Sequence, residues 1–168
     1  LGATAGRTTL LGEGLQHQDG HSLVLASTVP PCQAYDPAFA YEVATIIQAG
    51  IERMYGPATP GRPDPDVFYY LTLYNENYPM PPMPEGLTTA QVMRGLYRWQ
   101  TPPDAREPRA SILFSGSAQG AARQAAADLA ADFGIHVDLW SATSYKALRE
   151  EALAAERWSR LHPSHTAR

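Results

Sequence analysis

The sequence predicts an α/β protein built from two successive strand–helix–strand units. Runs rich in β-branched and aromatic residues, at residues 67–74 and 110–114, are typical of strands. Longer stretches with apolar residues at three- and four-residue spacing predict helices beside them. A proline-rich stretch at residues 79–84 separates the two units. Because strands alternate with helices, each unit is expected to contain a parallel strand pair with a right-handed crossover.

The first unit begins with a short apolar run at residues 22–28, which predicts one or two helical turns. Residues 32–35 predict a short strand. Asp36 followed by Pro37 then predicts a helix start, with Asp36 as the N-cap, and Gly56 ends that helix. The apolar residues of this helix form one stripe that we expect to be buried: Ala40, Val43, Ala44, Ile47, Ile51 and Met54.

The apolar run at residues 67–74 is nearly continuous, which predicts a strand buried on both faces. Residues 79–84 hold four prolines in six positions and predict an extended, stiff linker. We place the domain boundary there, so that residues 1–78 precede a linker at 79–86 and residues 87–168 follow it. Residues 88–99 predict a short helix with three apolar residues on one side: Val92, Leu96 and Trp99.

The second unit continues with a strand at residues 110–114, a helix at 118–133 and a strand at 135–140. The predicted buried face of that helix consists mainly of small residues: Ala118, Ala121, Ala122, Ala125, Leu129 and Phe133. Gly134 predicts a left-handed C-cap. A final helix is predicted at residues 145–161.

Composition places the chain among ordinary globular proteins. It has 168 residues, 44% hydrophobic and 18% charged, and a formal net charge of -4. This charge gives no reason to expect a nucleic acid or membrane partner, and no apolar run reaches the roughly 20 residues of a membrane span. The single cysteine, Cys32, excludes an internal disulfide and favours a cytoplasmic location. The N-terminus lacks a methionine and reads as though cut from a longer protein.

The stretch at residues 12–21 is the strongest candidate site. Its three glycines leave the backbone free to form a shaped loop. Its polar side chains are Glu13, Gln16, His17, Asp19 and His21. From the residues alone, His17 either hydrogen-bonds the backbone or transfers a proton near neutral pH. Asp19 and His21 are expected mainly to shape the loop. The spacing of these side chains matches no zinc signature, so we predict no metal site.

A second candidate site lies at residues 75–76. Asn75 and Glu76 follow the strand predicted at residues 67–74, and strand ends of open α/β sheets line crevices. The alternative is that these side chains only cap the sheet.

The loop and several other motifs carry a resemblance. The sequence resembles the homodimeric, thiamin-diphosphate-dependent pyruvate dehydrogenases, over nearly the whole chain. The motifs are Gly6-Arg7-Thr8-Thr9-Leu10-Leu11-Gly12-Glu13-Gly14-Leu15-Gln16-His17, Asp19-Gly20-His21-Ser22, Tyr35-Asp36-Pro37-Ala38-Phe39-Ala40-Tyr41-Glu42, Glu52-Arg53-Met54-Tyr55-Gly56, Asn75-Glu76-Asn77-Tyr78, Pro82-Met83-Pro84-Glu85-Gly86 and Glu156-Arg157-Trp158.

The resemblance implies roles for the loop residues. Gly14-Leu15-Gln16-His17 matches an element that places its imidazole beside the thiazolium carbon of the cofactor. There His17 would hydrogen-bond the carbonyl oxygen or carboxylate of a bound 2-oxo acid. Glu13 becomes either an acid near the cofactor or a solvated carboxylate, and His21 remains an active-site candidate.

The resemblance also implies a fold and partners. The chain would be a fragment, comprising the end of a transketolase-like pyrimidine-binding domain and the first half of a transketolase C-terminal-like domain. The intact enzyme would use thiamin diphosphate and Mg²⁺ to decarboxylate pyruvate, and would pass the acetyl unit to the lipoyl group of an acyltransferase. Its partners would be the rest of the parent polypeptide, a second subunit and that acyltransferase.

Two features of the family are missing from the sequence. There is no Gly-Asp-Gly element to anchor Mg²⁺ and diphosphate, and the activating glutamate of the family lies upstream of Leu1. We therefore expect the chain alone to bind no cofactor and to be inactive. Two alternatives stay open, namely a fragment of another thiamin enzyme such as a transketolase, and a non-catalytic α/β interaction module.

Overall fold

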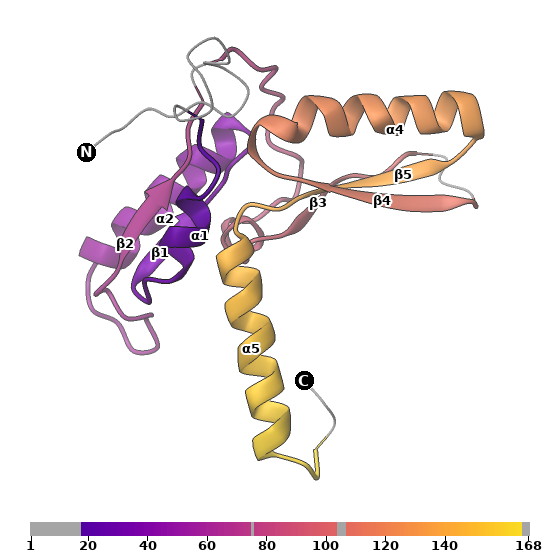
Figure 1. Cartoon of the computed structure of the whole chain (residues 1–168). Coiled ribbons are helices and arrows are strands. Elements are labelled where there is room, and N and C mark those ends of the chain that lie inside the picture. The colour runs from indigo at the N-terminus through magenta and orange to yellow at the C-terminus, as the bar shows by residue number, and fades with distance from the viewer. Residues whose placement is uncertain (1–17, 75, 104–106, 166–168) are drawn as a thin grey trace.

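The computed structural model describes residues 18–74, 76–103 and 107–165. It contains two small sheets, each with a helix packed against it (Figure 1). The first sheet pairs β1 (Cys32–Tyr35) with β2 (Phe68–Leu71) in parallel. The second has the order β3-β5-β4, formed by β3 (Tyr97–Gln100), β4 (Arg109–Phe114) and β5 (His136–Ser141). The α/β class is confirmed, and the strands predicted at residues 67–74 and 110–114 lie in separate sheets as expected.

The helices complete the two units. In the first unit, α1 (Ser22–Ser27) precedes β1, and α2 (Ala40–Tyr55) connects β1 to β2. In the second unit, α3 (Thr89–Met93) precedes β3, and α4 (Gln119–Phe133) connects β4 to its parallel neighbour β5. The last helix, α5 (Tyr145–Leu161), has the predicted bounds and extends away from the second sheet (Figure 1). None of the described helices has the length and apolarity needed to cross a membrane.

The predicted start of α2 was wrong. The helix begins at Ala40, and Asp36 does not cap it. Instead, the Glu42 side chain turns back and accepts hydrogen bonds from the backbone N–H groups of Ala38 and Phe39, at 2.6 and 3.1 Å. Asp36 is 2% exposed and bonds to groups distant in the sequence, so its tertiary contacts override its local preference for a cap.

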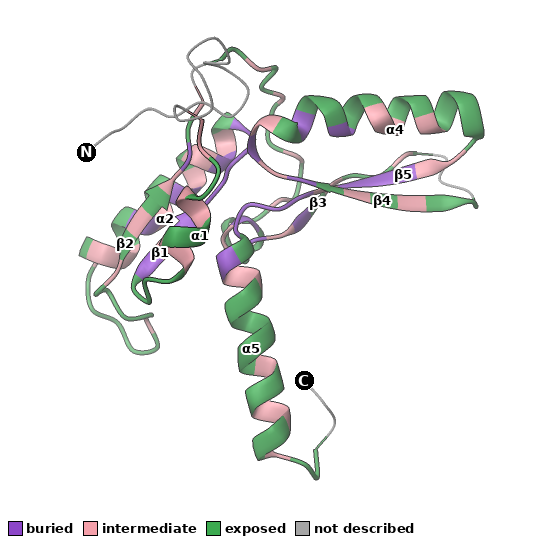
Figure 2. Cartoon of the chain, viewed as in Figure 1, coloured by how far each residue is buried: buried purple, intermediate pink, exposed green. Residues whose placement is uncertain are grey.

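The buried face of α2 also differs from the prediction. Ile46 and Gly50 are buried against the first sheet, whereas Ile47 and Ile51 are about half exposed. Along α2, exposed stretches alternate with buried and intermediate ones (Figure 2). A Cβ on Gly50 would lie 3.1 Å from the Tyr69 ring, so the missing side chain lets α2 approach β2 closely. The helix therefore carries a second apolar face that the described residues leave open.

The strand β2 is shorter and more exposed than expected. It covers Phe68–Leu71, and both Phe68 and Tyr70 are exposed. A parallel strand is usually covered on both faces, but this one lies at the edge of a sheet with two described strands. The prediction of burial on both faces was therefore wrong for this chain.

The helix predicted at residues 88–99 ends early. Thr88 caps α3 by accepting a hydrogen bond from the Gln91 backbone N–H, and Gly95 then turns the chain with a φ of 96°. Leu96 and Trp99 consequently lie beyond the helix, and Trp99 belongs to β3. In the folded chain Trp99 stacks on Phe39, with ring centroids 5.1 Å apart.

The helix α4 packs on the second sheet mainly through Ala122, with Ala126 and Leu129 partly buried beside it. Three residues predicted to be buried are exposed: Ala118 and Ala121 near the start of the helix, and Phe133, its last residue, at 70%. Gly134 has a φ of 64° and forms the predicted left-handed C-cap. Residues 77–84 form no regular element, and the side chain of Gln119 donates a hydrogen bond to the Pro79 carbonyl at 2.9 Å.

Candidate functional site

The seven site residues predicted from the sequence, five in the loop and two at residues 75–76, divide into two groups. Glu13, Gln16 and His17 lie outside the described residues, as does Asn75. Asp19, His21 and Glu76 are described. The roles assigned to all seven residues remain predictions, and the geometry below concerns the second group and its surroundings.

Asp19 and His21 form the entrance to α1. The Asp19 carboxylate accepts hydrogen bonds from the Ser22 backbone N–H at 3.0 Å and from the Ser22 hydroxyl at 2.5 Å. This side-chain arrangement satisfies a backbone donor that the first helical turn leaves unpaired. His21 is exposed, and its carbonyl accepts from Leu25 at 2.9 Å. Asp19 therefore fixes how the chain leaves the loop and enters α1.

A cavity of about 320 Å³ lies where β1 and β2 end. Phe39 and Val43 line one part of it, and Thr72, Tyr74 and Glu76 line another. The Glu76 carboxylate accepts a hydrogen bond from the Tyr78 hydroxyl at 2.7 Å. Glu76 thus lines a crevice at the carboxyl ends of parallel strands, which is the usual position of ligand sites in α/β sheets. Asp19 and His21 are not in the lining of this cavity.

Asp36 lies next to this cavity and binds two of its lining residues. Its side-chain Oδ1 accepts hydrogen bonds from the hydroxyls of Thr72 and Tyr74, both of which line the cavity. Its backbone N–H donates to Thr143 at 2.8 Å, and its carbonyl accepts from Gly116 at 3.2 Å. Asp36 therefore holds two cavity hydroxyls in place while joining the end of β1 to the second unit.

The lining of this cavity does not suit the cofactor that the resemblance implies. Of its described lining residues only Glu76 is charged, and the remainder of the lining is apolar or bears hydroxyl groups. A diphosphate needs cations or a metal ion, and a carboxylate repels it. The residues present here do not fit that group. Among the described residues there is also no cluster of three or more metal-ligating side chains.

Cys32 does not provide a nucleophile. The side chain is 2% exposed, and burial raises the pKa of its thiol, although the nearby Lys146 acts in the opposite direction. A thiol with a raised pKa is poorly ionised near neutral pH and reacts slowly.

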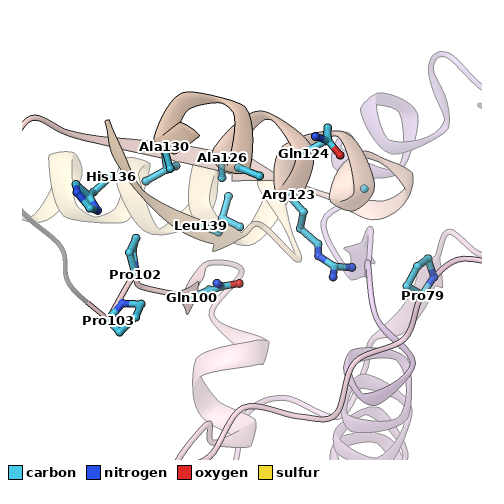
Figure 3. Close-up of a pocket in the computed structure, with 13 residues that line it drawn as sticks. Pro79, Gln100, Pro102, Pro103, Arg123, Gln124, Ala126, Ala130, His136 and Leu139 are labelled. Atoms are coloured by element: carbon cyan, nitrogen blue, oxygen red, sulfur yellow. The ribbon is translucent and has the colours of Figure 1, made fainter. Parts of the chain in front are cut away.

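A larger groove of about 620 Å³ lies between α4 and the segment that follows β3 (Figure 3). Leu139 and Ala130 contribute apolar surface, His136 lies at one end, and Arg123 projects from α4 towards the other (Figure 3). The Arg123 guanidinium carbon lies 5.7 Å from the centroid of the Trp99 ring, a cation–π arrangement that orients it. Of the predicted site residues, the three that the structure describes, Asp19, His21 and Glu76, do not line this groove.

Sequence reasoning missed Asp36, Thr72, Tyr74 and Gly116 as residues that shape the strand-end cavity. The available signal was an aspartate at the end of a predicted strand, which the adjacent Pro37 made to look like a helix cap. For Gly116 the sequence shows only a glycine after a predicted strand, and the left-handed φ of 48° that requires it is seen in the structure alone.

Comparison with known proteins supports the resemblance. Residues 1–81 match the family model described as the pyruvate dehydrogenase E1 component middle domain. The chain is 51% identical over 168 residues to the pyruvate dehydrogenase E1 component of Mycolicibacterium smegmatis. It is 49% identical to that of Mycobacterium tuberculosis over 167 residues, and 46% identical to that of Escherichia coli K12 over 168 residues.

These matches cover almost all of the chain but little of each relative. They span 99% of this chain and 17% of each mycobacterial protein, and 100% of this chain and 18% of the Escherichia coli protein. The resemblance predicted from the sequence motifs is confirmed.

Proposed function

Because this chain is a relative of the pyruvate dehydrogenase E1 components, we propose that it forms part of an enzyme that oxidatively decarboxylates pyruvate. The observation that carries this proposal is the 51% identity over 99% of the chain. The relatives are named for pyruvate, which favours this substrate over those of transketolases and of other 2-oxo-acid dehydrogenases. We place the chain at the junction of two domains, with residues 1–78 in a pyrimidine-binding domain and residues 87–168 in a C-terminal domain.

Thiamin diphosphate and Mg²⁺ are proposed for the intact enzyme only. Among the described residues that line the strand-end cavity, only Glu76 is charged, and a carboxylate is unsuited to a diphosphate. Other parts of the intact enzyme would therefore hold the cofactor. The proposed partners are the rest of the parent polypeptide, a second subunit and a lipoyl acyltransferase that receives the acetyl unit.

His17 is the proposed catalytic residue of this chain. An imidazole can donate or accept a proton near neutral pH, and the glycines of the loop allow it to approach a bound substrate. We assign it to the carbonyl oxygen or carboxylate of pyruvate, where it holds or donates a proton. Glu13 and Gln16 would orient that imidazole, and Asp19 would fix the end of the loop through its bonds to Ser22.

The test is replacement of His17 by alanine in the intact enzyme. General acid–base catalysis is typically worth about 10²–10⁴-fold, so turnover of pyruvate should fall within that range. Affinity for thiamin diphosphate should change little, because the proposed anchor lies elsewhere. His21→Ala is the matched control and should cost less. Near-normal turnover of His17→Ala, or loss of cofactor affinity in step with turnover, would contradict the assignment.

A separate measurement tests the expectation that this chain alone binds no cofactor. Calorimetric titration of the 168-residue chain with thiamin diphosphate and Mg²⁺ should give no saturable binding. A saturable isotherm would show that the chain itself anchors the cofactor.

A further inference from the structure

The contact between the two units is built around a buried carboxylate. Glu42, in the first turn of α2, is 0% exposed. One oxygen, Oε2, accepts the Ala38 and Phe39 backbone hydrogen bonds within the first unit. The other, Oε1, accepts from the Tyr97 hydroxyl and the Ser141 hydroxyl, each at 2.6 Å. One side chain therefore joins a turn of the first unit to two strands of the second.

The donors around Glu42 are themselves held in place. The hydroxyl oxygens of Tyr41 and Tyr97 are 2.6 Å apart, so Tyr41 can donate to Tyr97 while Tyr97 donates to Glu42. Burial, followed by the charge of Glu42, raises the pKa of the Tyr97 hydroxyl and keeps it a neutral donor. Ser141 is 1% exposed at the end of the central strand β5. Glu42, Tyr97 and Ser141 are all buried, so the bonds to Oε1 are shielded from water, whereas Tyr41 at the outer end of the network is half-buried.

Hydrogen bonds to a buried carboxylate depend strongly on orientation. Among the described residues no cation pairs with Glu42, so its charge is compensated by these donors. If the units rotated relative to each other, Oε1 would lose Tyr97 and Ser141 in a place that water does not reach. Apolar side chains of both units also pack here, Phe39 against Trp99 among them, but apolar packing has no fixed direction, whereas the hydrogen bonds to Oε1 do.

A second set of bonds crosses the same contact. The Asp36 backbone bonds to Thr143 and Gly116, and the Ser144 hydroxyl donates to the Ala34 carbonyl at 2.7 Å. The Tyr35 hydroxyl donates to the Met93 carbonyl at 3.1 Å. These bonds are spread along β1 and its end, so they resist rotation about the Glu42 network.

We propose that Glu42 is a positioning residue that holds the two units at one fixed orientation. Residues 79–84 then connect two units whose mutual orientation is fixed, and they do not act as a hinge between mobile domains. Because Glu42 also fixes the Ala38–Phe39 turn, which lines the strand-end cavity, the shape of that cavity is tied to the second unit. This inference does not depend on the reaction assigned to the intact enzyme.

The test measures the distance between the units in the intact protein. Spin labels carried by encoded amino acids are placed at two exposed helical positions, Gln48 in α2 and Asp128 in α4. With labelled subunits diluted in an excess of unlabelled ones, so that distances between subunits do not contribute, the unaltered protein should give one narrow distance distribution by electron–electron double resonance. Combined Tyr97→Phe and Ser141→Ala substitutions remove both donors to Oε1 and leave the bonds of Glu42 within the first unit intact. This variant should give a clearly broader distribution at temperatures well below unfolding.

The controls separate positioning from simple stabilisation. Glu52→Gln alters an exposed carboxylate on the same helix and should leave the distribution narrow, whereas Glu42→Gln should broaden it. If Glu42→Gln does not fold, the Tyr97→Phe and Ser141→Ala variant decides alone. A lowered melting temperature with an unchanged narrow distribution would make Glu42 merely stabilising and would overturn the proposal. A broad distribution in the unaltered protein would overturn it as well.

Discussion

The junction between the two units and the outward face of the first unit show opposite chemistry. At the junction, Asp36 and Glu42 are polar and almost completely buried. On the outward face of α2, Ile51 is 54% exposed and Tyr55 is 80% exposed. Buried polar groups and exposed apolar groups are both exceptions to the usual distribution of side chains, and such exceptions are informative about function.

The difference teaches that the two surfaces do separate tasks. The junction uses hydrogen bonds with defined directions, so it specifies one geometry between partners that are already present. The outward face of α2 and the exposed Phe68 of β2 offer apolar area without defined direction. Such a face suits packing against further structure. The small share of each relative that this chain spans agrees with that interpretation.

The substitution Gly116→Ala should have the largest effect and tests the junction directly. A Cβ at this position would overlap the Tyr74 hydroxyl and lie 2.6 Å from Asp36 Oδ1. The left-handed φ costs a non-glycine residue roughly 1–2 kcal/mol, and overpacking adds typically about 1–3 kcal/mol. In denaturant unfolding, the free energy of unfolding should fall by the sum of the backbone cost and the overpacking cost. Gly120→Ala, where a Cβ meets nothing within 4 Å, is the control. Equal stabilities of the two variants would mean that the junction tolerates rearrangement.

Two adjacent isoleucines on α2 sharpen the comparison. Ile46 is 0% exposed and Ile47 is 48% exposed, although the two differ little in sequence context. Ile46→Ala should lower the free energy of unfolding by about 2–5 kcal/mol, because it leaves a cavity. Ile47→Ala should cost about 0.5 kcal/mol or less in this chain. Measuring both variants by urea unfolding gives a matched pair. A large cost for Ile47→Ala in the intact protein alone would show that other structure covers this face there.

Local signals in the sequence predicted most of the elements. The bounds of α5 were correct because Ser144 provides a side-chain cap and Pro163 follows the helix end. Gly134 was correct because a left-handed C-cap requires little beyond its own backbone. In the candidate site, Asp19 bonds to Ser22 and Glu76 to Tyr78, so their contacts are local too.

Contacts between distant residues could not be predicted in the same way. Asp36 has the sequence context of a helix cap. In the folded chain it instead accepts hydrogen bonds from Thr72, Tyr74 and Gly116, which are distant in the sequence. The buried face of α2 could not be chosen either, since Ile46 and Ile47 both lie in apolar stripes. Which stripe is covered depends on the neighbouring sheet and not on helical periodicity. The positions of Glu13, Gln16, His17 and Asn75 remain predictions, because these residues lie outside the described part of the chain.

Lys146 offers a third test, at the edge of the junction. It is the only lysine of the chain and is 6% exposed. Its ammonium group donates to the carbonyls of Val29 and Cys32, each at 2.6 Å, and so fixes α5 against the start of β1. Lys146→Met keeps the apolar stem but leaves the buried Cys32 carbonyl unpaired, which costs about 1–3 kcal/mol, whereas the exposed Val29 carbonyl can bond to water. Thermal unfolding should detect this loss, and Arg149→Met on the exposed side of α5 should show little change.

The smallest expected effect concerns an ion pair away from the junction. Asp138 in β5 pairs with Arg109 in β4. A hydrogen bond from Thr101, followed by the bond and charge of Arg109, lowers the pKa of the Asp138 carboxyl below its ordinary value of 3.8. Since the folded-state pKa is lowered, the stabilisation is fully present above the unfolded-state pKa and is lost as the pH falls through the folded-state pKa.

The measurement compares Asp138→Asn with the unaltered protein by urea unfolding from pH 7 down to pH 3. The difference in unfolding free energy should stay constant between pH 7 and about pH 5, and should shrink below about pH 4. It should be smaller than for Gly116→Ala, Ile46→Ala and Lys146→Met, because the Arg109 side chain is 37% exposed and water screens the pair. Asp132→Asn, on the exposed surface of α4, is the control. If Asp138→Asn cost as much as Gly116→Ala, polar contacts away from the junction would contribute as much to stability as those within it. The special role assigned to the polar groups of the junction would then be wrong.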